Sequence, residues 1–133
     1  MTAVYSVLAL IAAFIGLLLL MRVVMLLKAR AAQGKPAPAL NGAPGKAIRR
    51  GRPALFYFFS PKCGACHSMT PTIMDLRKKQ RDAVFPIDVS RDRDTARKFG
   101  VMATPTTICV SGGTVKKVLI GPQPKPVIEQ LCS

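Results

Sequence analysis

The chain opens with a long run of apolar residues. Ala3 to Met21 contains no charged side chain, and after Arg22 the apolar residues resume from Val23 to Leu27. As a helix the first run is about 28 Å long, close to the roughly 30 Å hydrocarbon core of a bilayer. A chain of 133 residues offers no core large enough to bury such a helix. The pattern predicts one transmembrane anchor at residues 1–28, with Arg22 reaching the headgroups.

A cleaved signal peptide is the alternative for this segment. The run exceeds the roughly 7–15 apolar residues of a signal-peptide core, and no basic side chain precedes it. Ala29-Arg30-Ala31 nevertheless has the small-x-small pattern of a cleavage site. We expect an uncleaved anchor and leave cleavage open.

Residues 29–51 are rich in Ala, Gly and Pro and carry several basic side chains. This composition is typical of neither helix nor strand, so the segment is predicted to be a linker that holds a domain off the bilayer.

Residues 52–133 alternate strand and helix patterns. The apolar run Ala54–Phe59 is typical of a strand buried on both faces, and Pro86 places the next strand at a sheet edge. This order predicts an α/β domain with a mixed four-stranded sheet and helices on both faces. The expected elements are a strand at Ala54–Phe59, a helix at about Gly64–Gln80, a strand at Val84–Val89, a short helix ending at Phe99, strands at Thr106–Val110 and Val115–Ile120 joined by Gly112-Gly113, and a helix at Gln123–Leu131.

Charge is distributed unevenly along the chain. The formal net charge is +14, and residues 1–52 hold eight basic side chains and no acidic one. Basic residues that follow a membrane span favour the cytoplasmic side and attract anionic lipid, which makes the bilayer an expected partner. Nucleic acid is not an expected partner, because the chain lacks the interleaved aromatic and basic side chains that bind it.

Two cysteines mark the place where the first domain strand gives way to a helix. Cys63 and Cys66 are separated by two residues, so one helical turn brings their sulfurs within reach of a disulfide. Unpaired N–H groups at a helix N-terminus stabilise a thiolate and lower the pKa of Cys63 from its usual value of about 8.5. The pattern predicts thiol–disulfide exchange, which requires no cofactor and no metal.

The same residues also fit other chemistry. Cys63 to His67 forms the CxxCH motif of covalent c-type haem attachment, with Met69 or Met102 as an axial ligand. Zinc held by both cysteines, His67 and Cys109 is disfavoured, because adjacent helical residues do not easily chelate one ion. Cys109 is expected to be a small core residue. Cys132 is expected to play no part, so that the four cysteines form no disulfide framework.

Over residues 52–132 the chain resembles the thioredoxin family. Cys63-Gly64-Ala65-Cys66 matches the family's redox motif, and Pro71 matches the proline that kinks the helix after it. Thr104-Pro105 stands where the family has a cis-proline loop, and Gly113 and Gly121 match glycines of its final hairpin. The resemblance implies that Cys63 attacks a substrate disulfide, that Cys66 resolves the mixed disulfide, and that the Thr104 backbone beside Pro105 pairs with the substrate chain.

Three positions depart from the family pattern. Tyr57 stands where many thioredoxins have a buried acid, Lys62 replaces an aromatic residue and Ala65 replaces a proline. We expect Lys62 to lower the pKa of Cys63 further and to make the protein more oxidising than a typical thioredoxin. The family's N-terminal strand and helix are expected to be absent or rudimentary.

Together these features predict a membrane-tethered thiol–disulfide oxidoreductase. It would act on protein disulfides or dithiols and be recycled by an upstream redox partner, in a direction that the sequence leaves open. The expected location is a bacterial inner membrane, with charge favouring a cytoplasmic domain although anchored members of the family commonly face the periplasm. A non-catalytic thioredoxin-like binding module and a covalent haem carrier are the competing functions.

Overall fold

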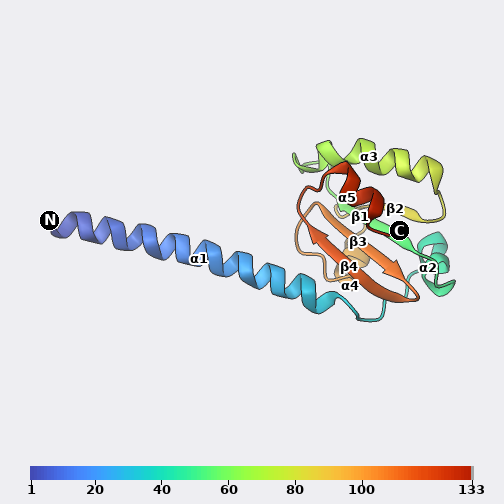
Figure 1. The fold of residues 1–133 in the computed structure, drawn as a ribbon, viewed down its shortest axis with the longest axis horizontal. Coiled ribbons are helices and arrows are strands. Elements are labelled where there is room, and N and C mark those ends of the chain that lie inside the picture. Colours follow the sequence, from blue (N-terminus) through green and yellow to red (C-terminus); the bar gives the residue numbers. More distant parts are fainter. Residues whose placement is uncertain (133) are drawn as a thin grey trace.

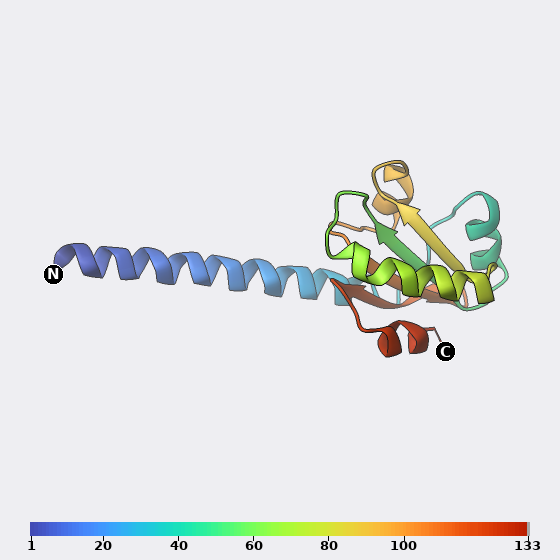
Figure 2. The same cartoon turned by 90° about the horizontal axis from the view of Figure 1, so that it is seen from above.

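The computed structural model describes residues 1–132 as one long helix followed by a small α/β domain (Figure 1). Helix α1 (Thr2–Ala32) has a mean hydropathy of 2.8 over its most apolar 18 residues, and none of its side chains is buried. It is long and apolar enough to cross a membrane. Figure 2 shows that it leaves the domain from one end and points away from it.

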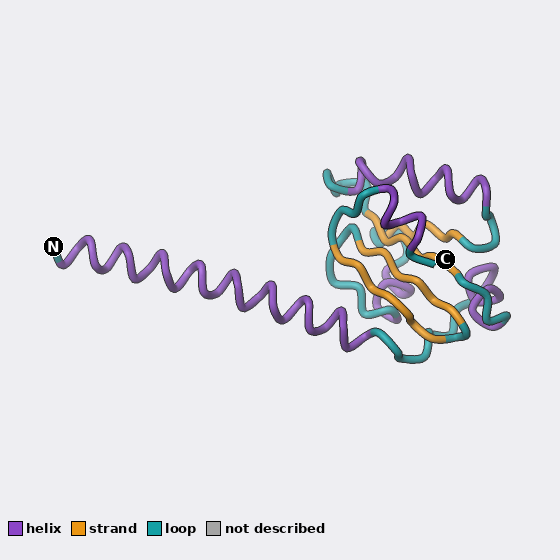
Figure 3. Tube along the Cα trace, viewed as in Figure 1, coloured by secondary structure: helices purple, strands orange, loops and turns teal. Residues whose placement is uncertain are grey.

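A four-stranded sheet forms the centre of the domain, in the order β2-β1-β3-β4. Strands β1 and β2 are parallel, and the other two pairs are antiparallel, so the predicted mixed sheet is confirmed. Figure 3 shows helices of the domain on both sides of the strands. The elements after α1 are α2 (Gly42–Arg49), β1 (Ala54–Phe59), α3 (Cys66–Lys79), β2 (Val84–Asp88), α4 (Arg93–Lys98), β3 (Thr106–Ser111), β4 (Thr114–Ile120) and α5 (Lys125–Gln130).

The two faces of the sheet support separate apolar clusters. Alternate residues of a strand point to opposite faces, so Phe56 and Phe58 face one cluster while Leu55 and Tyr57 face the other. The first cluster is closed by α2 and α4, and the second by α3 and α5. Because both faces are covered, β1 is apolar at every position, as its sequence predicts. Pro86 lies in edge strand β2, also as predicted.

The expectation that residues 29–51 form an irregular linker is wrong. α1 runs to Ala32, and Gly34 N–H then donates to Val115 O at 2.7 Å while Val115 N–H donates to Lys35 O at 2.9 Å. This pairing makes an isolated antiparallel bridge between Pro36 and Thr114 at the edge of β4. The following helix α2 buries Ile48 against the sheet, and only 9 % of the surface of Ile48 is exposed.

One glycine explains why the composition of residues 29–51 wrongly predicted an irregular linker. Gly45 lies inside α2, where a Cβ atom would collide with the Leu40 carbonyl oxygen. The glycine therefore permits a close approach of two backbone segments. A residue type that usually marks a loop instead serves packing at this position.

The expectation that Cys132 plays no part is also wrong. Cys109, in the middle of β3, forms a disulfide with Cys132, just beyond α5, and their Cα atoms are 5.6 Å apart. Cys109 is only 3 % exposed, as a core residue should be. The bond fastens the C-terminal helix to the sheet. The predicted domain limit at residue 133 lies outside the described residues.

Candidate active site

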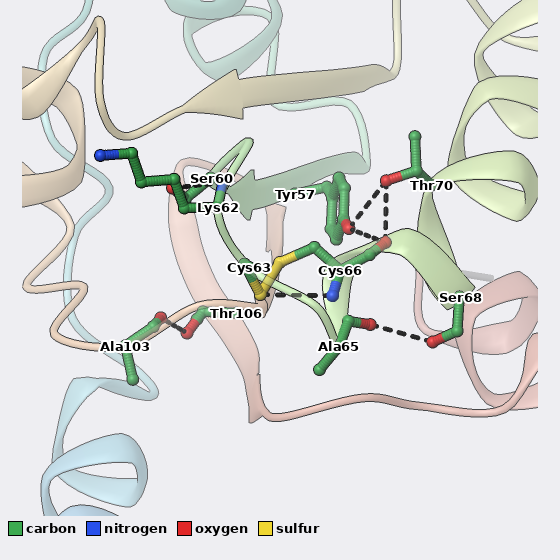
Figure 4. Close-up of a disulfide and its surroundings, with 10 residues drawn as sticks. All are labelled: Tyr57, Ser60, Lys62, Cys63, Ala65, Cys66, Ser68, Thr70, Ala103 and Thr106. Atoms are coloured by element: carbon green, nitrogen blue, oxygen red, sulfur yellow. Dashed lines mark hydrogen bonds between the residues drawn. A yellow bond between two sulfur atoms is a disulfide. The ribbon is translucent and has the colours of Figure 1, made fainter.

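The Cys63–Cys66 pair lies in the loop between β1 and α3 and at the start of α3 (Figure 4). The two cysteines form a disulfide, with Cα atoms 5.3 Å apart. α3 begins at Cys66, two residues later than its pattern predicts. Cys63 therefore precedes the helix, and Cys66 occupies its first turn.

The backbone at the helix start is directed at the first sulfur. Cys66 N–H donates to Cys63 Sγ at 3.2 Å, which uses one of the N–H groups that have no partner within a helix. Cys63 is half-buried, whereas Cys66 is only 2 % exposed. An incoming disulfide therefore reaches Cys63 first.

Two hydroxyl groups hold the carbonyl of the second cysteine. Tyr57 Oη donates to Cys66 O at 3.1 Å, and Thr70 Oγ1 donates to the same oxygen at 2.8 Å. Tyr57 is fully buried, and this burial raises the pKa of its hydroxyl, although the hydrogen bond with Thr70 lowers it in part. At neutral pH the site beneath the disulfide is therefore uncharged at the position where many thioredoxins have an acid.

The Thr104–Pro105 peptide bond is cis, as predicted. Buried Thr106 donates from Oγ1 to Ala103 O at 2.6 Å, which holds the turn in front of β3. Because Phe58 pairs with Thr106, the end of β1 and the start of β3 lie side by side. The loop of the cysteine pair and the proline loop therefore leave the sheet at the same end.

Lys62 and His67 lie outside this cluster. Both are exposed, and Figure 4 shows the Lys62 side chain extending away from the disulfide. Within residues 1–132, no hydrogen bond joins either side chain to a cysteine sulfur. Cys109 is bonded to Cys132, on a separate part of the domain, rather than gathered with Cys63, Cys66 and His67 around a metal.

Two further polar groups of the site are not evident from the sequence. Nothing in the local pattern marks Thr70 as more than an ordinary helix residue, and only the fold brings its hydroxyl to Cys66 O. Thr107 is fully buried opposite Tyr57, and its Oγ1 has no hydrogen-bond partner within the described part of the chain. The first five residues of β3 are all buried, so the sequence of this strand does not distinguish Thr107 or reveal its lack of a partner.

Comparison with known proteins agrees with this architecture. The family model described as Thioredoxin matches residues 45–133, which is more than half of the chain. The chain belongs to the thioredoxin family. The match begins within α2, so this thioredoxin family member shares more than the predicted segment from residue 52 with its relatives.

Similar sequences include bacterial thioredoxins. The chain is 35 % identical over 86 residues to thioredoxin from Alicyclobacillus acidocaldarius subsp. acidocaldarius, covering 63 % of this chain and 82 % of that protein. It is 33 % identical over 76 residues to thioredoxin from Bacillus subtilis (strain 168), covering 56 % and 73 % of the two chains. These homologues indicate thiol–disulfide oxidoreductase activity of the thioredoxin type, with Cys63 and Cys66 as the redox-active pair.

Solved structures show the same fold. A mutant thioredoxin from Halobacterium salinarum NRC-1 matches with a TM-score of 0.59 and 25 % identity, covering 75 % of this chain and 92 % of that one. A thioredoxin from Nicotiana alata matches with a TM-score of 0.57 and 29 % identity, over 65 % and 75 % of the two chains.

Proposed function

We propose that the protein is a membrane-tethered thiol–disulfide oxidoreductase that exchanges disulfides with protein substrates, with Cys63 as the attacking and Cys66 as the resolving cysteine. The observation that carries the assignment is the hydrogen bond from Cys66 N–H to the half-buried Cys63 sulfur. In the reduced protein the same N–H stabilises a thiolate on Cys63, the form that attacks a disulfide.

The exchange balances as two successive sulfur displacements. The Cys63 thiolate attacks one sulfur of a substrate disulfide, so that a Cys63–substrate disulfide forms and the other substrate sulfur leaves as a thiolate that takes up a proton. Cys66 then loses its proton to water and attacks the Cys63 sulfur as a thiolate. The Cys63–Cys66 disulfide forms, and the second substrate sulfur leaves as a thiolate that takes up a proton from water. Two electrons pass to the substrate, and a dithiol redox partner must return them for another cycle.

The substrate chain is proposed to lie along the Thr104–Pro105 loop. This loop leaves the sheet beside Cys63, and Pro105 has no backbone N–H, so the backbone of half-buried Thr104 remains available to the incoming chain. Exposed Gly64 and Ala65 leave the approach to the sulfur open. Lys62 adds positive charge near the substrate path but does not contact the sulfur.

Cysteine variants test the assignment. Cys66→Ser should trap substrate on Cys63 as a stable mixed disulfide, whereas Cys63→Ser should abolish both trapping and reduction of insulin disulfides. A double variant with Cys109→Ala and Cys132→Ala is the matched control and should retain exchange activity. If Cys63→Ser retained exchange, the choice of nucleophile would be wrong. If the wild type and the control variant bound a partner but did not exchange disulfides, a binding module would be the correct function.

The anchor and its sidedness are part of the proposal. The length and hydropathy of α1 support an uncleaved span. The basic residues after it favour a cytoplasmic domain, but domains of this size translocate largely regardless of charge. The Cys109–Cys132 disulfide favours an oxidising compartment, because structural disulfides rarely persist in the cytosol. We therefore place the domain on the oxidising, periplasmic side of a bacterial inner membrane.

A C-terminal fusion to a reporter enzyme that needs its own disulfides tests the side. Activity of the reporter in intact cells is expected, and an inactive but intact fusion would place the domain in the cytoplasm. Mass determination of the N-terminus of the membrane-extracted protein separates an anchor from a cleaved signal peptide.

A further inference from the structure

No flexible segment separates α1 from the domain within the described residues. Gln33 N–H donates to Arg30 O at 3.1 Å at the end of the helix, and the very next residue, Gly34, already pairs with Val115. Ala37 N–H extends this pairing to Gly113 O at 2.8 Å. The direction of α1 relative to the sheet is therefore set by backbone hydrogen bonds rather than left free by a linker.

The last turns of α1 pack along β4 and extend toward the end of the sheet where the redox pair lies. Lys28 and Ala32 line a small cavity together with Thr106, Val118 and Ile120, from the start of β3 and the end of β4. The cysteine and proline loops leave the sheet at this same end. Figures 1 and 2 agree in showing the start of α3 on the side of the domain that faces α1.

One large apolar side chain of the domain lies exposed beside the helix. Met102 is 70 % exposed, and it lines an open groove with Leu20, Met21 and Val24 of α1. Lys28 Nζ donates to Met102 Sδ at 3.8 Å. Leu20 precedes the end of α1 by twelve residues, which is about 18 Å along the helix axis. Because Met102 shares a groove with Leu20, it lies beside apolar turns of α1 rather than beside the C-terminal end of the helix.

The surroundings of Met102 match one partner, a lipid bilayer. The groove continues the apolar surface of the helix that is proposed to cross the membrane. Arg22 and Lys28 place positive charge at the same level, and residues 1–52 contain no acidic side chain. An anionic headgroup region meets both requirements, apolar contact and opposite charge.

We propose that the Gly100–Ala103 loop is a second membrane contact, with Met102 inserted into the bilayer interface beside α1, and that this contact holds the Cys63–Cys66 pair facing the membrane. The membrane contact rests on the proposed span of α1, and its redox consequence rests on the proposed function. The disulfides served are then those of membrane-bound proteins, presented close to the bilayer surface.

Fluorescence tests the contact independently of activity, because the chain contains no tryptophan. The full chain carrying Met102→Trp is reconstituted in vesicles of phosphatidylcholine and phosphatidylglycerol with brominated acyl chains. Its emission should shift to shorter wavelength and be quenched several-fold more strongly than that of Lys79→Trp, at the far end of α3. Equal, weak quenching of the two variants would overturn the contact, whether or not the protein exchanges disulfides.

A pair of substrates tests the consequence. The reconstituted protein should reduce a lipid-anchored peptide disulfide several-fold faster than the same peptide in solution. Met102→Asp should lower this preference and leave the rate with the soluble peptide unchanged, since Met102 does not touch the redox pair. Equal rates with both peptides would overturn the restriction to membrane-bound substrates. A lack of exchange with either peptide would instead count against the proposed function.

Discussion

The hydroxyl of Tyr57 lies 3.1 Å from the carbonyl oxygen of Cys66 and donates a hydrogen bond to it. A buried phenol on the central strand thereby holds the first turn of α3, which carries the second redox cysteine. The adjacent Thr70 hydroxyl, 3.3 Å from the phenol oxygen, shares the same carbonyl. A neutral hydrogen-bonded group thus supports the redox helix at the position where many thioredoxins have an acid.

Replacing Tyr57 with Phe should lower the free energy of unfolding by about 1 kcal/mol at pH 7, the contribution of one buried hydrogen bond. Thr70 still satisfies the Cys66 carbonyl in this variant, so no larger loss is expected. Denaturant unfolding of the oxidised protein measures the change. Thr70→Val, alone and combined with Tyr57→Phe, shows whether the two hydroxyl groups act together.

The same residue predicts a loss of stability in alkali. Burial raises the pKa of Tyr57 in the folded protein, so above about pH 10 the unfolded chain loses this proton more readily than the folded one. The contribution of the neutral Tyr57 phenol to the free energy of unfolding is fully present below pH 10. It is lost as the pH rises from there through the pKa of Tyr57 in the folded protein. From pH 10 to 11, the stability advantage of the wild type over Tyr57→Phe should therefore shrink, because the unfolded chain ionises first. An unchanged difference over this range would contradict the prediction.

Thr107→Val should leave the domain as stable as before or stabilise it by about 1 kcal/mol, because it replaces a buried hydroxyl that has no partner within residues 1–132 by a methyl group of similar size. Denaturant unfolding measures this change. Thr106→Val is the matched comparison and should be destabilising, since the Thr106 hydroxyl bonds to Ala103 O. A destabilised Thr107→Val variant would show that the hydroxyl is hydrogen-bonded in solution.

Removal of the second disulfide by Cys109→Ala with Cys132→Ala should cost about 3 kcal/mol in the oxidised protein, as expected for a loop closed across 23 positions. Exchange activity should persist while the domain remains folded. Cys63→Ser with Cys66→Ser, which opens a bridge of sequence separation 3, should cost far less. Equal losses from the two double variants, measured by denaturant unfolding, would contradict the structural role of Cys109–Cys132.

Gly45→Ala should destabilise the domain by about 2 kcal/mol, because its Cβ atom collides with backbone that has no side-chain freedom to move. Lys46→Ala, an exposed position in the same helix, is the control and should change the free energy of unfolding little. A neutral Gly45→Ala variant would indicate that the Leu40 carbonyl does not lie against Gly45 in solution.

Several elements are correctly predicted because they depend on short-range patterns. These features depend only on residues in the same element or in the next one along the chain. They are the apolar run of β1, the edge position of Pro86, the paired glycines of the β3–β4 turn and the strand–helix junction at Cys63. The prediction for residues 29–51 is wrong because the structure of this segment does not depend on short-range patterns. Its order comes from contacts with β4 and the sheet, which its own composition does not indicate.

The sequence by itself determined that a long apolar helix precedes a small α/β domain and that a cysteine pair stands at a helix start, because side-chain chemistry and periodicity set these features locally. The tertiary structure decided which distant groups meet. It bonded Cys109 to Cys132, directed the Tyr57 and Thr70 hydroxyl groups to Cys66, and packed the C-terminal part of α1 along β4 toward the redox end of the sheet. These contacts depend on the register of the strands and the packing of helices across them, which no local pattern specifies.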